Sequence, residues 1–303
     1  MPSPHNSDST PVVVGIVASH GSEPALRWAA ETAAQRHRRL RIVHGIDLFS
    51  QSSTVEGDET LTPAIIDEIR GRGATAVFEA AESARRIAPD LDIETEVSDD
   101  SPARLLIEQS KAAHLTVLGV TPRTGTFAHL GSTLLAVTSH GHGSVVVVRP
   151  TDSDSGPELR HDGPVVVGID GSPVSEAAVA AAFAEASVRR TDLVAVHCGS
   201  DRRVGSFAGR TVSSSDANAI ETAESAVLAE RLAGWQDKYP EVTITRKVYL
   251  TGATHHLTQW SNSAQLVVVG NRGRGGFTGL LLGSTSNFLV QHAHCPVLVA
   301  HSD

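Results

Sequence analysis

A glycine-rich stretch in the second half of the chain has the composition of an anion-binding loop. It spans residues 270–285, with glycines at positions 270, 273, 275, 276, 279 and 283 and then Ser284-Thr285. Glycines let backbone N–H groups approach an anion closely. The helical stretch that opens at Gly283-Ser284 would add free amides and a helix dipole, both of which favour phosphate. A flexible connection followed by a serine N-cap would account for the same residues. Glycine patterns alone are weak evidence for an anion site, so this alternative stays open.

A carboxylate follows another apolar run, in the segment Gly168-Ile169-Asp170. Asp170 could accept hydrogen bonds from ribose hydroxyls or help to hold a metal ion on phosphates. The alternative is an ordinary turn aspartate before a helix that is capped by Ser172, with Pro173 at its first position. If the carboxylate and the glycine loop meet at one sheet edge, a nucleotide site is the favoured interpretation.

The elements that would position these residues occur twice along the chain. The segment PVVVGI begins at residue 11 and again at residue 164, and LGST begins at residue 130 and again at residue 282. Four such anchors recur in the same order, which indicates a tandem duplication. We therefore predict a first domain over residues 1–150, a polar linker over 151–163 and a second domain over 164–303.

Short apolar runs predict five strands in each half, separated by helix-length stretches. The predicted strands are 12–17, 40–46, 91–97, 115–119 and 145–149, then 165–170, 192–198, 242–249, 266–270 and 297–301. Strands buried on both faces and alternating with helices predict an α/β fold with parallel sheets. Ligands of such sheets bind beyond the carboxyl ends of the strands, so function is expected after the first and fourth strand of each half.

The best-defined helix pattern spans residues 219–238. Its predicted apolar face comprises Ile220, Ala223, Val227, Leu228, Leu232 and Trp235. These positions recur with helical spacing, so we expect this face, including the tryptophan, to pack in the core.

Together these motifs resemble those of the universal stress protein family, in its tandem, actinobacterial form. The pattern G-x-x-G, nine residues, G-[ST] is present as Gly270, Gly273 and Gly283-Ser284, with VVVGIDGS before it and HAHCPVLVA after it. The resemblance covers essentially the whole chain. It implies Rossmann-like, ATP-binding α/β domains with five parallel strands in the order 3-2-1-4-5 and helices on both faces. It also implies dimers through the last strand, here residues 297–300, or internal pairing of the two halves.

The resemblance assigns roles to individual positions of the second half. Asp170 would lie against the ribose and phosphates, with Mg²⁺ on the ATP as a further option. The backbone near Cys198 would meet the adenine edge, and Val269-Gly270 would line the ribose. The residues that would cradle the triphosphate are Gly273, Gly283, Ser284 and Thr285. Gly168 and Ile169 precede the carboxylate, and Arg272 and Arg274 could neutralise phosphates or simply be solvated.

The first half departs from this pattern. Val17 stands where Asp170 does, Ala18 replaces Gly171, and Pro122 replaces Gly273, which removes one loop amide. The weaker candidates that remain are Gly15, Gly119, Gly131, Ser132 and Thr133. We expect ATP to bind well only in the second half, with the first half as a structural or interaction domain. Binding of ATP in both halves stays the alternative.

Composition narrows the class of protein. With 25 Lys and Arg against 34 Asp and Glu, the net charge is −9, which disfavours nucleic-acid binding. No apolar run is long enough for a membrane span and no signal peptide is visible, so a cytoplasmic location is expected. Cys198 and Cys295 form neither a disulfide framework nor a zinc motif. We expect Cys198 to behave as a small buried apolar side chain.

Histidines are numerous but do not form an evident metal site. His140-x-His142 and His292-x-His294 lie in matching loops before the last strands, and His255-His256 lies near a helix start. A tetrahedral set of three or four ligands is not visible in either half. His44 and His197 hold matching places at the end of the second strand, where each could form a hydrogen bond across the switch point.

The sequence favours a nucleotide-dependent regulator over a dedicated enzyme. It lacks the G-x-x-x-x-G-K-[ST] phosphate loop and offers no assignable catalytic triad or positioned general base. An adenine nucleotide and an unknown protein partner are the expected ligands. Two alternatives stay open: a slow Mg-dependent ATPase that uses Asp170, and an assembly scaffold that binds no nucleotide.

Overall fold

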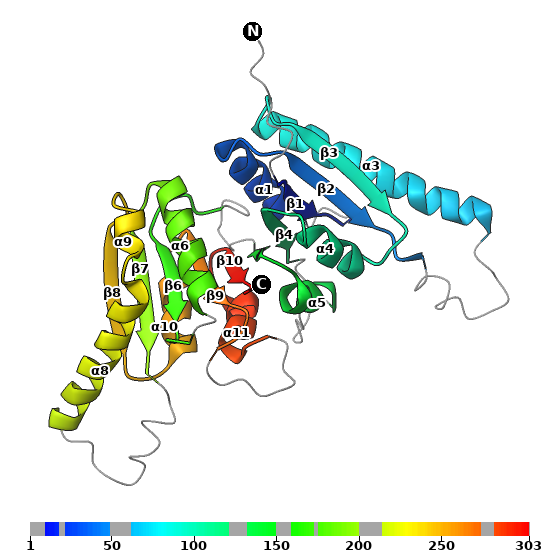
Figure 1. The fold of residues 1–303 in the computed structure, drawn as a ribbon. Helices are drawn as coiled ribbons and strands as arrows, with labels where there is room; N and C mark the ends of the chain where they lie inside the picture. Colours follow the sequence, from blue (N-terminus) through cyan, green and yellow to red (C-terminus); the bar gives the residue numbers. More distant parts are fainter. Residues whose placement is uncertain are drawn as a thin grey trace. The chain divides into compact units, whose positions relative to one another are not determined.

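The chain forms two compact units, Met1–Arg149 (unit 1) and Pro150–Asp303 (unit 2). They are seen in a computed structural model, drawn in Figure 1. The structure describes residues 10–17, 22–48, 62–120, 132–149, 159–172, 175–199, 214–273 and 282–302.

Unit 1 is built around a parallel sheet. Its elements are β1 (Val12–Gly15), α1 (Glu23–Gln35), β2 (Leu40–Gly45), α3 (Pro63–Ile87), β3 (Ile93–Ser98), α4 (Pro102–Ser110), β4 (Leu115–Gly119), α5 (Ser132–His140) and β5 (Ser144–Val148). The strands lie in the order β3-β2-β1-β4-β5, with every neighbouring pair parallel.

Unit 2 repeats this plan. Its elements are β6 (Val165–Ile169), α6 (Ser175–Arg189), β7 (Leu193–Cys198), α8 (Ser214–Leu232), α9 (Trp235–Lys238), β8 (Ile244–Tyr249), α10 (Ala253–Ser261), β9 (Leu266–Gly270), α11 (Ser284–His292) and β10 (Val297–Ala300). The order is β8-β7-β6-β9-β10, again parallel throughout. Counted from the first strand of each unit, both orders read 3-2-1-4-5.

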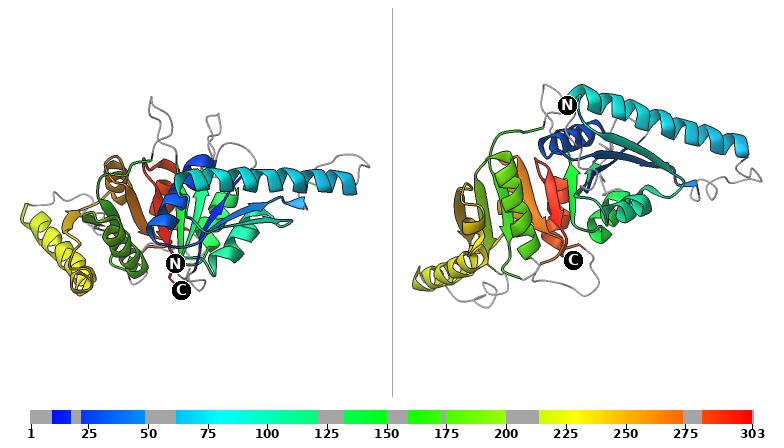
Figure 2. Two further views of the ribbon diagram at one scale, coloured as in Figure 1. Left: turned by 90° about the horizontal axis from the view of Figure 1, so that it is seen from above. Right: turned by 45° about the horizontal axis from the view of Figure 1, so that its top comes forward.

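Helices cover both faces of each sheet (Figures 1 and 2). In unit 1, α1 and α3 pack on one face and α4 on the other, with α5 beside it. In unit 2, α6 and α8 cover one face, while α10 and α11 cover the other. No helix within the described segments is long and apolar enough to cross a membrane.

The valine runs form the centre of each core, as their composition predicts. Val12, Val13 and Val14 are fully buried in β1, and residues 165–167 are fully buried in β6. β-branched side chains fit a sheet that is covered on both faces. The predicted α/β fold is confirmed, and every predicted strand is present within two residues of its expected ends.

The prediction of one helix over residues 219–238 is wrong in two respects. The helix α8 ends at Leu232, and α9 begins after Gly234, whose φ of 77° only glycine adopts at little cost. The buried face also contains Glu224 in place of Ala223, which is exposed. Trp235 lies in α9, half-buried, and stacks on Phe183 with ring centroids 5.5 Å apart.

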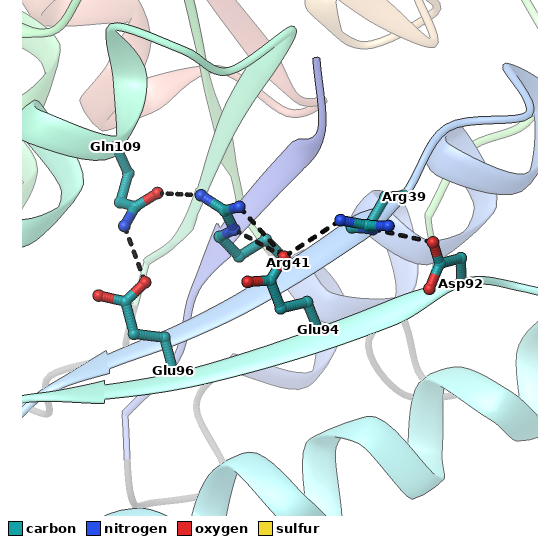
Figure 3. Close-up of polar contacts among 6 residues, drawn as sticks. All are labelled: Arg39, Arg41, Asp92, Glu94, Glu96 and Gln109. Atoms are coloured by element: carbon teal, nitrogen blue, oxygen red, sulfur yellow. Dashed lines mark hydrogen bonds and ion pairs between the residues drawn. The ribbon is translucent and has the colours of Figure 1, made fainter. Parts of the chain in front are cut away.

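A polar network ties the edge strand β3 of unit 1 to β2 and α4 (Figure 3). Its members are Arg39, Arg41, Asp92, Glu94, Glu96 and Gln109. Arg41 donates to Glu94 at 3.1–3.2 Å and to Gln109 at 2.8 Å, and Gln109 donates to Glu96 at 2.8 Å. Arg39 bonds Asp92 at 2.8 Å, and this bond raises the pKa of the guanidinium. Polar cross-strand pairs thus hold this edge strand in register.

Candidate functional site

The carboxyl ends of three neighbouring strands of unit 2 form one edge. β6 ends at Ile169, β7 at Cys198 and β9 at Gly270. β6 lies between β7 and β9, with Ile169 paired to His197. Residues that follow these strands are therefore brought together although they are far apart in sequence, as the topology predicts.

Asp170, directly after β6, organises a tight turn. Its Oδ1 accepts a hydrogen bond from the Ser172 backbone N–H at 2.9 Å and another from the Ser172 hydroxyl at 2.6 Å. One carboxylate oxygen therefore has the role of an ordinary turn aspartate. The helix α6 begins at Ser175, whose hydroxyl donates to the Ser172 carbonyl at 2.7 Å. Pro173, which the alternative places at the first position of a helix capped by Ser172, lies outside the described residues.

The other carboxylate oxygen faces the glycine loop. A Cβ atom placed on Gly273 would lie 2.8 Å from Asp170 Oδ2, closer than real Cβ atoms come. Glycine at this position therefore allows the loop backbone to lie against the carboxylate. Asp170 and the start of the loop therefore meet at one edge of the sheet, the arrangement that favours a nucleotide site.

Backbone bonds hold both ends of the loop on the sheet. The Asn271 N–H donates to the Ala300 carbonyl at 2.9 Å, and the Gly283 N–H donates to the Asn271 carbonyl at 2.8 Å. The buried Ser286 hydroxyl donates to the Gly270 carbonyl at 2.6 Å. The first turn of α11 is thereby fixed next to the end of β9. Arg274 and the residues up to 281 lie outside the described part of the chain.

The helix α11 begins without a side-chain cap. Gly283 is its N-cap residue and has no side chain to accept hydrogen bonds from the first-turn amides. Ser284 is exposed and Thr285 is half-buried. The N-terminal amides and the positive dipole end of a nine-residue helix favour an anion at this place. Arg272, just before the loop, is exposed.

Several candidate positions can offer a ligand only their backbone or serve packing instead. Ile169 and Val269 are buried, with 2% and 4% of their surfaces exposed. A Cβ on Gly168 would lie 2.9 Å from Leu257 Cδ1 of α10, so this glycine is needed for helix packing. Cys198 is half-buried, in contrast to the expected buried thiol.

The corresponding edge of unit 1 lacks the carboxylate. Val17 is exposed, and its N–H donates to the Ser22 hydroxyl at 2.9 Å. Gly15, at the end of β1, packs against Leu106 as Gly168 packs against Leu257. Gly119 ends β4, and Ser132 and Thr133 open α5. Ala18, Pro122 and Gly131 lie outside the described residues.

His44 and His197 each form a hydrogen bond to the neighbouring first strand of their unit, so neither bond crosses the switch point, which lies between β1 and β4 or between β6 and β9. His44 Nδ1 lies 3.0 Å from the Ile16 carbonyl, and His197 Nδ1 lies 2.6 Å from the Ile169 carbonyl. His197 also contacts Glu224 of α8, with 2.6 Å between Nε2 and Oε2, and both side chains are buried. Glu224 was not among the residues predicted from the sequence. The available signal was the helical spacing from Ile220 through Glu224 to Leu228, which places a carboxylate in the apolar stripe.

The other histidine motifs lie in turns and helix termini. The backbone N–H groups of His142 and His294 donate to Ser110 and Ser261, at 2.9 and 3.0 Å. His256 stacks on Tyr249 with ring centroids 3.6 Å apart, and burial, with a smaller effect of His255, lowers its pKa. Within the described segments, no group of three or more His, Cys, Asp or Glu side chains could hold a metal ion.

Burial raises the pKa of the Cys295 thiol to about 12.

Comparison with known proteins places the chain among relatives of the same two-unit length. The model of the universal stress protein family matches residues 9–149 and 163–301. Universal stress protein Rv2005c of Mycobacterium tuberculosis is 40% identical over 294 residues, covering 95% of this chain and 96% of its own. Rv2623 of the same organism is 38% identical over 299 residues, covering 97% of each chain.

A solved structure supports the fold across both units. The crystal structure of a universal stress protein from Archaeoglobus fulgidus matches with a TM-score of 0.66 and 16% identity, covering 97% of this chain and 99% of that one. At this identity the match concerns the fold alone. The family model, however, matches both units, and the mycobacterial relatives are similar along nearly the whole chain. The protein therefore belongs to the universal stress protein family.

Proposed function

We propose that unit 2 binds an adenine nucleotide, with ATP as the ligand, and that occupancy of this site regulates the protein's interaction with a partner. The observation that carries the proposal is the arrangement at the edge of the sheet. The Asp170 carboxylate faces Gly273, and α11 begins without a side-chain cap close to the end of β9. A carboxylate beside an open helix start fits a ligand that has both hydroxyl and phosphate groups.

Each part of the nucleotide has a matching group in unit 2. The Asp170 carboxylate would accept hydrogen bonds from ribose hydroxyls, and the first-turn amides of α11 would bind phosphate oxygens. The Ser284 and Thr285 hydroxyls would add neutral donors to the phosphates. The adenine would lie at the end of β7 near Cys198. The same carboxylate is the type of donor that Mg²⁺ prefers, so Asp170 would hold a magnesium ion bound to the phosphates.

Unit 1 would not bind the nucleotide comparably. Val17 presents an apolar side chain at the position that corresponds to Asp170, so a ribose hydroxyl there would have no charged acceptor. A lost charge-assisted hydrogen bond costs about 1.5–3 kcal/mol, which weakens binding by a factor of about 10 to 100. Unit 1 would therefore serve as a structural or interaction domain.

Isothermal titration calorimetry with Mg-ATP tests this function on the full chain. Asp170→Asn retains the shape of the side chain and an oxygen for Ser172, but removes the charge. We expect it to raise the Kd for Mg-ATP by a factor of about 10 to 100. Asp237→Asn, at an exposed site on α9, is the matched control and should leave the Kd unchanged.

Equal Kd values for the wild type and Asp170→Asn would overturn this role of Asp170. Release of ADP and phosphate during the titration, above a protein-free control and lost in Asp170→Asn, would favour a slow ATPase instead. No heat of binding in the wild type, with an unchanged Tm in millimolar Mg-ATP, would favour the scaffold function, since a ligand at 100 times its Kd stabilises by about 2.7 kcal/mol.

A further inference from the structure

The buried pair of His197 and Glu224 connects helix α8 to the candidate nucleotide site. His197 has no exposed surface and Glu224 only 1%, so neither could reach a ligand directly. Their side chains meet at 2.6 Å in the core, at the edge where β6 and β7 end. An ionisable pair in such a place is costly unless its hydrogen bonds are well formed.

The geometry requires a proton between the two side chains. The Ile169 carbonyl can only accept a hydrogen bond, so His197 Nδ1 carries a hydrogen and donates it across 2.6 Å. A bare Nε2 lone pair and a carboxylate oxygen would repel each other at 2.6 Å, so a second proton lies between them. The pair is therefore an imidazolium with a carboxylate, or a neutral imidazole with a carboxylic acid. Either form gives a continuous hydrogen-bonded chain from Glu224 to the Ile169 carbonyl.

This chain ends on the peptide group that leads into Asp170. The Ile169 carbonyl and the Asp170 nitrogen belong to one planar peptide unit, so fixing the carbonyl also fixes the positions of the Asp170 nitrogen and Cα. Asp170 then closes its turn through Ser172 and faces Gly273. The position of the carboxylate thus depends on Glu224, a residue of helix α8.

Unit 1 has a different arrangement at the equivalent place. His44 makes the same kind of bond to Ile16 at a longer distance, 3.0 Å, and is half-buried. Helix α3 contacts its ring at Gly73, where an added Cβ would lie 3.0 Å from His44 Cδ2. The helix therefore presents a glycine to the ring in the unit with Val17, and a glutamate in the unit with Asp170.

We propose that Glu224 and His197 are positioning residues, which hold the Ile169–Asp170 peptide and thereby set the place of the Asp170 carboxylate at the nucleotide site. This inference rests on the proposed function of unit 2. It predicts that a change in α8, remote from any ligand contact, weakens nucleotide binding through Asp170.

Calorimetry with Mg-ATP on variants of the full chain tests this coupling. Glu224→Ala should raise the Kd by a factor of about 3 to 30, the range expected for coupling through an intervening residue. Glu224→Gln should have a smaller effect, because its amide can still bond to His197. Glu230→Ala, at an exposed site on the same helix, should leave the Kd unchanged. In an Asp170→Asn background, Glu224→Ala should add little, because both changes act on one group.

A merely structural role gives different results. Glu224→Ala would then lower stability without changing the Kd, or would keep its full effect on the Kd in the Asp170→Asn background, and either result overturns the proposal. If Glu224→Ala does not fold, Glu224→Gln carries the same double-mutant test. ¹⁵N NMR of the histidine rings should show hydrogen on both ring nitrogens, or a shared proton on Nε2, for His197 in the wild type. An Nε2 that neither carries a hydrogen nor accepts a hydrogen bond from Glu224 in the wild type would contradict the paired proton.

A separate readout distinguishes this inference from the proposed function. Hydrogen exchange of the Ser172 amide reports the bond to Asp170 without any ligand. Faster exchange in Glu224→Ala than in Glu230→Ala supports the positioning role even if the wild type binds no Mg-ATP, a result that would reject only the proposed function. Unchanged Ser172 exchange in Glu224→Ala overturns the positioning role whatever the wild type binds.

Discussion

Asp170 and Val17 hold the same place after the first strand of their units, but their surroundings differ. The carboxylate closes a turn with Ser172 and leaves its second oxygen against Gly273. Val17 exposes 43% of its surface and offers only its backbone N–H, to Ser22. At this position, therefore, only unit 2 has a side chain that can accept a hydrogen bond. The glycine opposite is equally specific, because any larger residue would displace the carboxylate.

Two glycines of α3 show how far the effect of one added methyl group depends on its neighbours. A Cβ on Gly71 meets no atom within 4 Å, whereas one on Gly73 would lie 3.0 Å from His44 Cδ2 and 3.1 Å from Val97 Cγ1. We expect Gly71→Ala to raise the free energy of unfolding by about 1 kcal/mol, because alanine favours a helix interior over glycine.

Gly73→Ala should not raise the free energy of unfolding, since overpacking against His44 and Val97 costs about 1–3 kcal/mol and offsets the gain in helix propensity. Urea denaturation of both full-length variants, followed by circular dichroism, measures the difference. If Gly73→Ala proves as stable as Gly71→Ala, the close contact between α3 and the His44 ring is refuted.

At the scale of the element, α11 is fixed firmly to the sheet but begins without a stabilising side-chain cap. Its buried Ser286 ties it to the end of β9, whereas its N-cap is a glycine, which gives no side-chain acceptor to the first turn. A helix optimised for stability alone would begin with Asp, Asn or Ser. The missing cap is consistent with amides that are kept free for a ligand.

Substitution of the N-cap should therefore separate stability from binding. Gly283 has φ −61° and ψ 148°, and an added Cβ would have its nearest neighbour at 3.5 Å, so a side chain fits. Gly283→Asp should stabilise the ligand-free protein by about 0.5 kcal/mol through capping and the helix dipole. Its charge should at the same time raise the Kd for Mg-ATP by a factor of about 10 or more, through repulsion of the phosphates.

Gly283→Ser provides the matched control, because it adds a cap without a charge and should weaken binding less. Thermal unfolding without ligand and calorimetry with Mg-ATP measure the two effects. Wild-type affinity in Gly283→Asp would show that phosphate does not bind at the start of α11.

At the scale of the whole molecule, the fold follows from the sequence more directly than the details of the site. The valine runs fit only strands that are covered on both faces, so the strands and their parallel arrangement could be predicted. The meeting of Asp170 and Gly273 also followed, because parallel strands place their carboxyl ends together. The break at Gly234 was missed because helical periodicity continues on either side of it.

The buried charge of Glu224 was harder to predict. A carboxylate in the core needs a partner, and that partner, His197, comes from a different strand of the sheet. Helical spacing alone offered Ala223 as the more plausible core residue. The contact between the two side chains arises from tertiary structure, so the helical spacing that places Glu224 in the apolar stripe does not by itself identify its partner.

The number of nucleotides bound per chain tests the central claim most directly. Equilibrium dialysis of the full-length wild type against ATP and Mg²⁺, at concentrations up to saturation, gives this number. We predict one ATP per chain, strongly weakened in Asp170→Asn and retained in Asp237→Asn. Two per chain would contradict the loss of the site in the unit with Val17, and no bound ATP at millimolar concentration would contradict the nucleotide site of unit 2 altogether.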